Sequence, residues 1–169
     1  IDEAHTYVGF SVKHMMVSTV RGQFHTYSGT FQVDEQELTR SKVSGQIEVA
    51  SIDTHNSQRD DHLKSADFFD VANYPVMTYE SKRVETDDNQ QFKVYGDLTI
   101  RGVTQEVVLD VEFYGQSKDP WGNLRSGFSA TGNLNRKDFG LVWNAVLETG
   151  GIAVGDQIKL QLDVELVSS

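Results

Sequence analysis

Five histidines are the residues of this sequence whose chemistry first suggests a site. His5 and His14 are separated by an odd number of residues, so on one regular strand their side chains point to opposite faces. His25 belongs to a different predicted strand. His55 and His62 share a helix face only if the helix begins before its capping residues, and the sequence contains neither H-x-H nor H-E-x-x-H. We therefore predict no metal site, and a solvated or helix-capping role for these histidines.

The run Arg59-Asp60-Asp61-His62 places an acid beside a base. Consecutive residues of a helix diverge by about 100°, so these side chains do not converge on one substrate atom and are expected to form a charged outer helix face. The sequence contains no G-x-S-x-G or S-x-x-K nucleophile motif, no G-x-G-x-x-G loop and no P-loop. We therefore predict no catalytic residue, no catalytic cofactor and no enzymatic activity.

The composition favours one soluble domain with an acidic surface. The 169 residues are 38% hydrophobic, and Lys+Arg 15 against Asp+Glu 25 gives a net charge of −10, which repels nucleic acid and an anionic membrane surface. No apolar run approaches the ~20 residues of a spanning helix, so stable membrane insertion is not expected. The absence of cysteine excludes disulfides. Because the chain begins at Ile1 without a methionine, we interpret residues 1–169 as one domain from which either a signal peptide or the rest of a larger exported protein has been removed.

The elements that must position any site are β-strands, because apolar and polar residues alternate through most of the chain. Each predicted strand is apolar on one face only, which implies an antiparallel sheet with one covered side. Closure into an eight-stranded barrel leaves no exposed edge, and a two-sheet sandwich is the structural alternative. The predicted strands cover residues 6–14, 24–33, 42–52, 76–84, 92–100, 106–113, 125–135 and 158–166.

One short helix interrupts this pattern after the third predicted strand. Asn56 or Ser57 can cap it, and Pro75 forbids its continuation into the next strand. Phe68 and Phe69 arrive just as the helix ends. The helix is therefore predicted to plug one end of the barrel, where apolar side chains would otherwise meet water. A turn at Arg21-Gly22 is expected to open the second strand. Met15 and Met16 would suit a mouth or an irregular gap, and the alternative is that they fill the core.

The chain resembles the YceI-like, polyisoprenoid-binding family along nearly its whole length. The resemblance implies a lipocalin-like, eight-stranded antiparallel barrel with a helix after the third strand and a long apolar tunnel. The tunnel would hold an isoprenoid lipid, such as a quinone like ubiquinone or a polyprenyl phosphate or pyrophosphate, for storage or transport. It also implies a periplasmic or secreted protein, homodimers among its members, and no established enzymatic activity. The motifs that carry the resemblance are Phe10-x-Val12-x-His14, Val20-x-Gly22-x-Phe24, Ser51-Ile52-Asp53-Thr54, Arg59-Asp60-x-His62-Leu63-x-Ser65-x-Asp67-Phe68-Phe69-Asp70, Tyr74-Pro75, Gly96-Asp97-Leu98-Thr99-Ile100-x-Gly102-Val103-Thr104, Gly127-Phe128, Arg136-x-Asp138-Phe139-Gly140-Leu141 and Val154-Gly155-Asp156.

Ten apolar residues are the candidate ligand-binding set, and a polar mouth with Arg136, Lys13 or Arg21 would select the head group. Three alternatives stay open at this point: a carrier of fatty acids or their amides, a haem- or metal-dependent redox enzyme, and an interior filled by its own side chains. The residues predicted to line or close the tunnel are Phe10, Val12, Phe24, Leu63, Phe68, Phe69, Tyr79, Phe128, Trp143 and Leu147.

Overall fold

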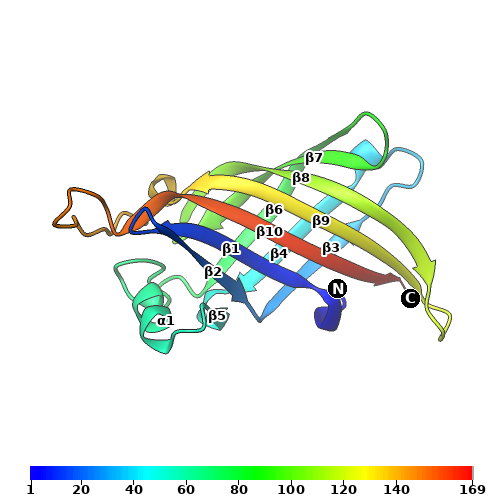
Figure 1. Cartoon of the computed structure of the whole chain (residues 1–169). Coiled ribbons are helices and arrows are strands. Elements are labelled where there is room, and N and C mark those ends of the chain that lie inside the picture. Colours follow the sequence, from blue (N-terminus) through cyan, green and yellow to red (C-terminus); the bar gives the residue numbers. More distant parts are fainter. Residues whose placement is uncertain (169) are drawn as a thin grey trace.

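The computed structural model describes residues 1–168 as one curled sheet with a short helix, α1 (Ser57–Lys64), beside one end (Figure 1). Ten strands pair only antiparallel, in the order β3-β4-β6-β7-β8-β9-β10-β1-β2-β5, and form a curled half-barrel. The strands are β1 (Tyr7–His14), β2 (Ser18–Phe24), β3 (Tyr27–Gln32), β4 (Lys42–Glu48), β5 (Ile52–Asp53), β6 (Val76–Thr86), β7 (Gln91–Ile100), β8 (Val103–Lys118), β9 (Leu124–Asn135) and β10 (Val154–Ser168).

The all-β, antiparallel fold with one short helix is confirmed, but the expected closed barrel of eight strands is wrong: the described residues form ten strands in a half-barrel whose end strands, β3 and β5, do not pair with each other. The predicted strand 42–52 is divided into β4 and β5 by a 3₁₀ turn at Val49–Ser51. Ser51 Oγ accepts hydrogen bonds from the backbone N–H groups of His25 and Thr26, at 3.2 and 3.0 Å, and so fixes the bend between β2 and β3. The bend lets β2 pair with β1 while β3 pairs with β4.

The turn before β2 also lies elsewhere than predicted. Arg21 and Gly22 lie inside β2, opposite Ser11 and Phe10 of β1. The chain turns instead at Met15-Met16-Val17, where Met15 and Met16 adopt positive φ angles of 50° and 62°. A glycine after a polar residue suggests a turn, but Gly22 is needed for space: a Cβ there would lie 2.5 Å from Cζ of the Phe10 ring.

Both long sides of the curled sheet are tied together. Where β2 runs into β3, the Glu48 N–H donates to the Thr26 carbonyl at 2.9 Å. At the other side the segment 1–6 lies between β3 and β10, because the Tyr27 hydroxyl donates to the Thr6 carbonyl at 2.9 Å and the Asp2 N–H donates to the Glu165 carbonyl at 2.8 Å.

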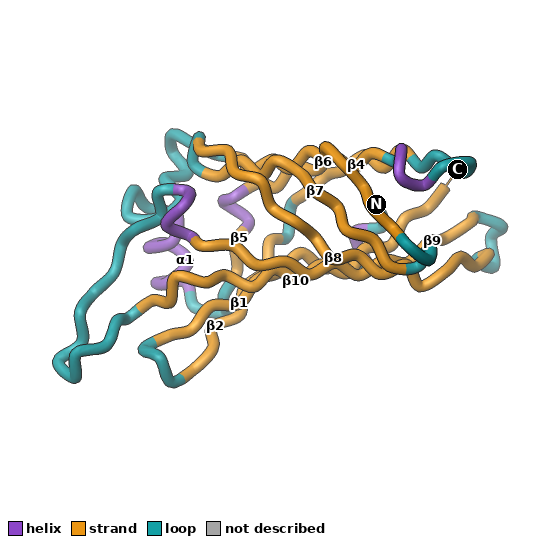
Figure 2. Tube along the Cα trace, turned by 90° about the horizontal axis from the view of Figure 1, so that it is seen from above, coloured by secondary structure: helices purple, strands orange, loops and turns teal. Residues whose placement is uncertain are grey.

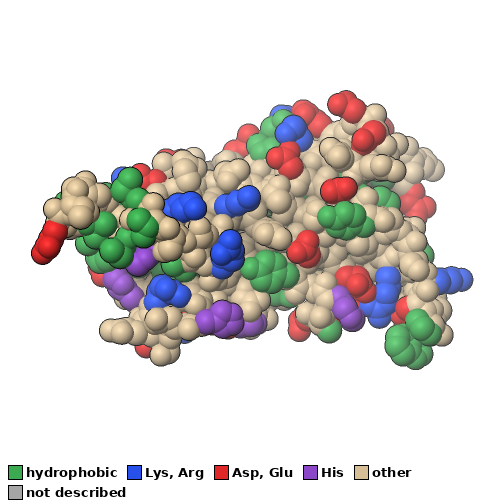
Figure 3. Space-filling model, viewed as in Figure 1, with side chains coloured by type: hydrophobic (Ala, Val, Ile, Leu, Met, Phe, Trp, Pro, Cys, Tyr) green, Lys and Arg blue, Asp and Glu red, His purple; other side chains and the backbone are tan. Residues whose placement is uncertain are grey.

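The helix forms for the predicted reason. Asn56 is the N-cap, and its side-chain oxygen accepts the Arg59 N–H at 2.9 Å. Seen from above, α1 lies at the same end of the sheet as the long 140–153 connection (Figure 2). On the face shown in Figure 3, apolar side chains gather most densely at this end.

The packed core is concentrated at the helix end, whereas the inner wall elsewhere is only partly covered. The inner residues of β10 (Ile158, Leu160, Leu162, Val164 and Leu166) are all half-buried, although they face the interior. The interior is therefore not filled along its whole length by its own side chains. The buried cluster consists of Val8, Phe24, Val49, Ile52, Phe68, Met77, Ile100, Val107, Phe139 and Leu141.

Segment 1–6 should detach in acid. A hydrogen bond from Arg125, followed by one from His5, holds the pKa of Asp2 at about 2. Because this pKa is depressed, its contribution to stability is complete above the unfolded value and is lost as the pH falls through about 2. We expect the ¹H–¹⁵N resonances of Asp2 and Ala4 to keep native positions down to about pH 4 and to lose them toward pH 2. Asp2→Asn should remove this acid dependence, and an unchanged profile in that variant would contradict the assignment.

Candidate functional site

Three of the predicted residues meet in one aromatic row on the inner surface. Phe10 on β1 and Phe24 on β2 have ring centroids 5.8 Å apart, and Phe24 meets Phe69 at 6.3 Å in an edge-on arrangement. Phe69 follows α1, so this row joins the sheet wall to the helix end. These three side chains therefore form one continuous apolar surface.

A second cluster closes the helix end of the interior. Phe68, which is 5% exposed, lies 5.4 Å from the ring of Trp143, and Leu63 packs against the same core. His62 stands edge-on to both rings, at 5.1 and 4.7 Å, and its Nε2 lies 2.8 Å from a carboxylate oxygen of Asp67. His62 is therefore a packing residue as well as a polar one.

Tyr79 is built into the wall. Its hydroxyl is placed to donate to the carbonyl of Val94 at 3.1 Å or Val107 at 3.2 Å, and burial raises its pKa far above the ordinary value. A Cβ at Gly96 would lie 2.4 Å from the Tyr79 ring, so the glycine is needed for this packing.

The other three predicted residues lie apart from the core. Phe128 on β9 stacks with Phe113 of β8 at 5.0 Å, and Val12 pairs with Val20 and Ile158 near the β1–β2 turn. Leu147 lies in the long connection, where its N–H donates to the Gly151 carbonyl at 2.8 Å. The structure therefore divides the predicted set into a helix-end group, a wall residue and three scattered positions.

The inner face leaves room at Gly45, a residue that sequence reasoning missed. Gly45 alternates with the half-buried Val43 and Ile47 on β4, while the residues between them are exposed. A Cβ built at Gly45 would meet one atom within 4 Å, the Ser28 carbonyl oxygen at 3.7 Å. By contrast, the space where a Cβ at Gly96 would lie is already occupied by the Tyr79 ring. The signal was an inward glycine in a strand, which often marks a site of close approach.

Arg136 cannot serve as the cation of a mouth, contrary to the expectation. It is 3% exposed, and its guanidinium donates to the carbonyls of Leu141, Trp143 and Gly155 at 2.6, 2.8 and 2.8 Å. Burial lowers its pKa, although a guanidinium stays charged in proteins. Lys13 and Arg21 are exposed on the outer face, because their neighbours along β1 and β2 alternate inward.

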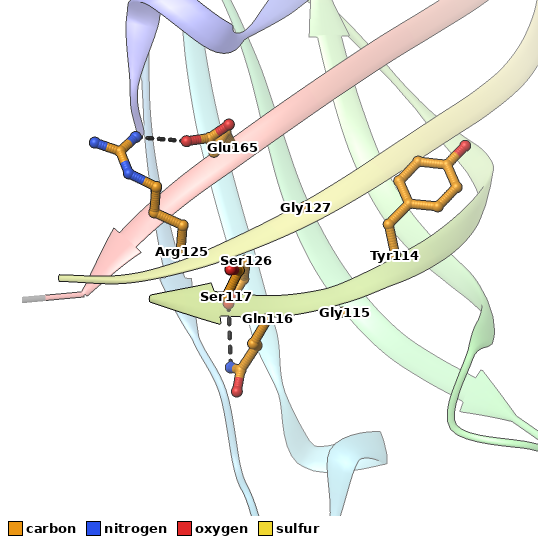
Figure 4. A pocket seen from close by; sticks show the side chains of 8 residues that line it. All are labelled: Tyr114, Gly115, Gln116, Ser117, Arg125, Ser126, Gly127 and Glu165. Carbon is orange, nitrogen blue, oxygen red and sulfur yellow. Dashed lines mark hydrogen bonds and ion pairs between the residues drawn. The ribbon is translucent and has the colours of Figure 1, made fainter. Parts of the chain in front are cut away.

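A polar surface pocket of about 330 Å³ lies where β8, β9 and β10 run side by side (Figure 4). Its cation, Arg125, is neutralised by ion pairs to Glu165, Asp2 and Asp119. Asp2, His5 and Glu165 offer ligand atoms within 4.8 Å of one another, but Arg125 occupies two of these carboxylates. The pocket is lined by none of the ten predicted residues, only by Tyr114, Gly115, Gln116, Ser117, Arg125, Ser126, Gly127 and Glu165.

Comparison with known proteins identifies the family. Residues 1–166 match the YceI-like domain. The chain belongs to the YceI-like family. A UPF0312 protein of Staphylococcus aureus is 40% identical over 165 residues, which cover 97% of this YceI-like chain and 94% of that protein. A UPF0312 protein of Staphylococcus epidermidis is 41% identical with the same coverage.

Solved structures have the same fold as this YceI-like chain. A Campylobacter jejuni YCEI protein is 37% identical with a TM-score of 0.79, covering 100% of this chain and 96% of that one. Burkholderia cenocepacia BcnA superposes with a TM-score of 0.86 at 22% identity, covering 98% and 99%. A polyisoprenoid binding domain from Saccharophagus degradans, implicated in plant cell wall breakdown, has a TM-score of 0.70 at 14% identity, covering 99% and 97%. The last two, below 25% identity, show the fold alone.

In residues 1–168 no helix has the length and apolar character to cross a membrane.

Proposed function

We propose that this YceI-like chain binds an isoprenoid lipid, with the tail inside the curled sheet, and stores or transports it without catalysis. The observation that carries the proposal is an apolar inner face with unfilled space beside Gly45. The half-buried inner residues of β10 supply more uncovered apolar surface of the same kind. The structural likeness to a domain that binds polyisoprenoids supports this ligand class.

Removal of hydrocarbon from water would supply the affinity. At ~0.8 kcal/mol per buried CH₂-sized group, each five-carbon unit gains roughly 3 to 4 kcal/mol before ordering costs. A few units suffice for tight binding. Because this attraction has no direction, the interior should select ligands by the length and width of their hydrocarbon tails and not by the arrangement of their polar groups.

The head group decides between a quinone, such as ubiquinone, and a polyprenyl phosphate or pyrophosphate. The two differ in charge, so the salt dependence of affinity separates them: screening changes the affinity for an anionic head group and leaves that for a quinone almost constant. As part of the same proposal the protein acts in the periplasm or outside the cell, which fractionation of the native host would test.

The proposal is tested by native mass spectrometry of the purified protein, followed by organic extraction of the released molecules. An isoprenoid at near one per chain is the expected result. A folded protein that arrives empty and takes up no added isoprenoid would overturn the proposal. If a fatty acid displaces the bound molecule and an isoprenoid does not, the protein is a fatty-acid or fatty-amide carrier. The visible spectrum and metal analysis test for a redox enzyme.

Phe69→Gln should weaken isoprenoid binding by about tenfold or more, because a polar side chain replaces an apolar ring worth ~1.5–3 kcal/mol on burial. Phe69 belongs to the inner aromatic row. Affinity measured by titration with a short prenyl quinone checks this, and Tyr114→Gln is the matched control because Tyr114 is 65% exposed. If a folded Phe69→Gln variant binds the quinone as tightly as the wild type, Phe69 does not contact the ligand.

A further inference from the structure

Two exposed apolar turns lie together at the helix end of the molecule. In the β1–β2 turn Met16 is 69% exposed and Val17 is 84% exposed, and in the long connection Val146 is 84% exposed. The two turns touch: the Met15 N–H donates to the Ala153 carbonyl at 2.9 Å. They project from the same end in Figures 1 and 2. We use the name apolar tip for Met15, Met16, Val17, Val146 and Ile152.

The apolar tip is held in an ordered conformation. Met15 and Met16 adopt the left-handed region at φ 50° and 62°, which is uncommon for residues other than glycine and asparagine. In the second turn Val146 forms a β-bridge with Ile152, and the Asn144 side-chain oxygen accepts the N–H groups of Ala153 and Val154 at 3.0 and 3.1 Å. The strained backbone of the first turn and the hydrogen bonds of the second therefore hold these apolar side chains in exposed positions. An exposed apolar patch of this kind marks an interaction surface.

Cations without acidic partners lie behind the apolar tip. Ser11 pairs with Lys159 on one side and with Arg21 on the other, so these two cations flank it on the outer face, and Lys13 lies two residues further toward the tip. Within residues 1–168 none of these three has a carboxylate within 4 Å. By contrast, Lys82 is paired with two acids. Lys and Arg side chains gather on this half of the face in Figure 3.

We propose that the helix end docks reversibly on an anionic lipid bilayer, with the apolar tip at the boundary of head groups and acyl chains. Lys13, Arg21 and Lys159 would face lipid phosphates. The net charge of −10 opposes approach, but the Debye length of about 8 Å at physiological ionic strength makes the local cations decisive at contact. Glu148 in the second turn, Asp61 of α1 and Asp67 after it oppose docking, whereas the three cations lie together on the outer face of β1, β2 and β10.

A second copy of the chain fits this surface less well. A stable protein interface buries roughly 800 Å² on each partner, whereas two turn tips offer only a few side chains. A bilayer accepts small protruding apolar groups without shape complementarity. The inference does not depend on the proposed function, because docking is measured with vesicles that contain no isoprenoid.

Flotation with vesicles of phosphatidylcholine, with and without phosphatidylglycerol, tests the proposal. Wild-type protein should float with the phosphatidylglycerol vesicles, and added salt should weaken this binding. Combined Met16→Ser, Val17→Ser and Val146→Ser should reduce binding at least about tenfold. The matched control is Trp121→Ser, which removes a residue that is 80% exposed in the β8–β9 turn at the opposite end and should bind as wild type.

Charge reversal tests the cations separately. Combined Lys13→Glu, Arg21→Glu and Lys159→Glu should lower the affinity for phosphatidylglycerol vesicles by about fivefold or more per residue, with Lys118→Glu as the control. Far-UV circular dichroism confirms folding of each variant.

Three results would overturn the proposal. The first is that the wild type does not float, and the second is that Trp121→Ser loses flotation while the tip variant keeps it. The third is that the wild type sediments as a dimer and that, of these variants, only the tip variant does not.

Discussion

Gly45→Phe should abolish most isoprenoid uptake while the protein stays folded. The Cβ position at Gly45 faces the interior and meets one atom within 4 Å, so a ring there would occupy space that we assign to the lipid tail. Displacement of one five-carbon unit costs ~3 kcal/mol, which is roughly a hundredfold in affinity. Stability should not fall, because an aromatic residue suits a strand better than glycine.

The matched control for this prediction is Gln46→Phe. Gln46 is the next residue of β4 and is exposed on the outer face, so it receives the same ring on the opposite side of the sheet. Both variants are compared by thermal unfolding and by quinone titration. If Gly45→Phe binds as tightly as Gln46→Phe at equal stability, the lipid does not occupy the space beside β4. Native mass spectrometry of the Gly45→Phe protein should then still show the ligand, and the proposed location would be abandoned.

The strands could be predicted from the sequence wherever one face is apolar and the other polar along the whole strand. In β10 the alternation of Ile158 to Leu166 with polar residues predicts the strand and its inner face. The corner between β2 and β3 leaves only a weak signal, a one-residue shift in the alternation between Phe24 and Tyr27, and the contact that fixes the bend comes from Ser51, far along the chain. A strand count therefore depends on a contact between residues distant in sequence.

The candidate site was predicted only in part for the same physical reason. The pair Phe68-Phe69 follows a helix and could be expected at one end of the sheet, and Phe68 is buried there. Gly45 carries no side chain, so its value as free space depends on what stands opposite it. Arg136 resembles a surface cation in sequence, and only the folded 140–153 connection and the start of β10 together supply the carbonyl oxygens that surround it.

Arg136→Met should be strongly destabilising. The change leaves the carbonyl oxygens of Leu141, Trp143 and Gly155 without their donor in a buried place. An unsatisfied buried polar group costs about 1–3 kcal/mol, so we expect the free energy of unfolding to fall by about 3 kcal/mol or more. The long connection should loosen first, because the guanidinium joins both of its ends.

Fluorescence of Trp143 reports this loosening directly. In a Trp121→Phe background Trp143 is the remaining tryptophan, and it should shift to longer wavelength in Arg136→Met as it leaves Phe68. Lys137→Met is the control: Lys137 makes an exposed ion pair with Asp156 at 3.2 Å, and such pairs contribute about 0–1 kcal/mol.

Arg136→Lys separates charge from geometry. A lysine keeps the positive charge but cannot direct several N–H groups in one plane at three carbonyls, so its stability should lie between wild type and Arg136→Met. If Arg136→Met keeps both the denaturation midpoint and the Trp143 spectrum of the wild type, the guanidinium does not hold the connection. If Arg136→Lys is as stable as the wild type, the charge alone suffices, and the fork of hydrogen bonds to Leu141, Trp143 and Gly155 contributes nothing measurable.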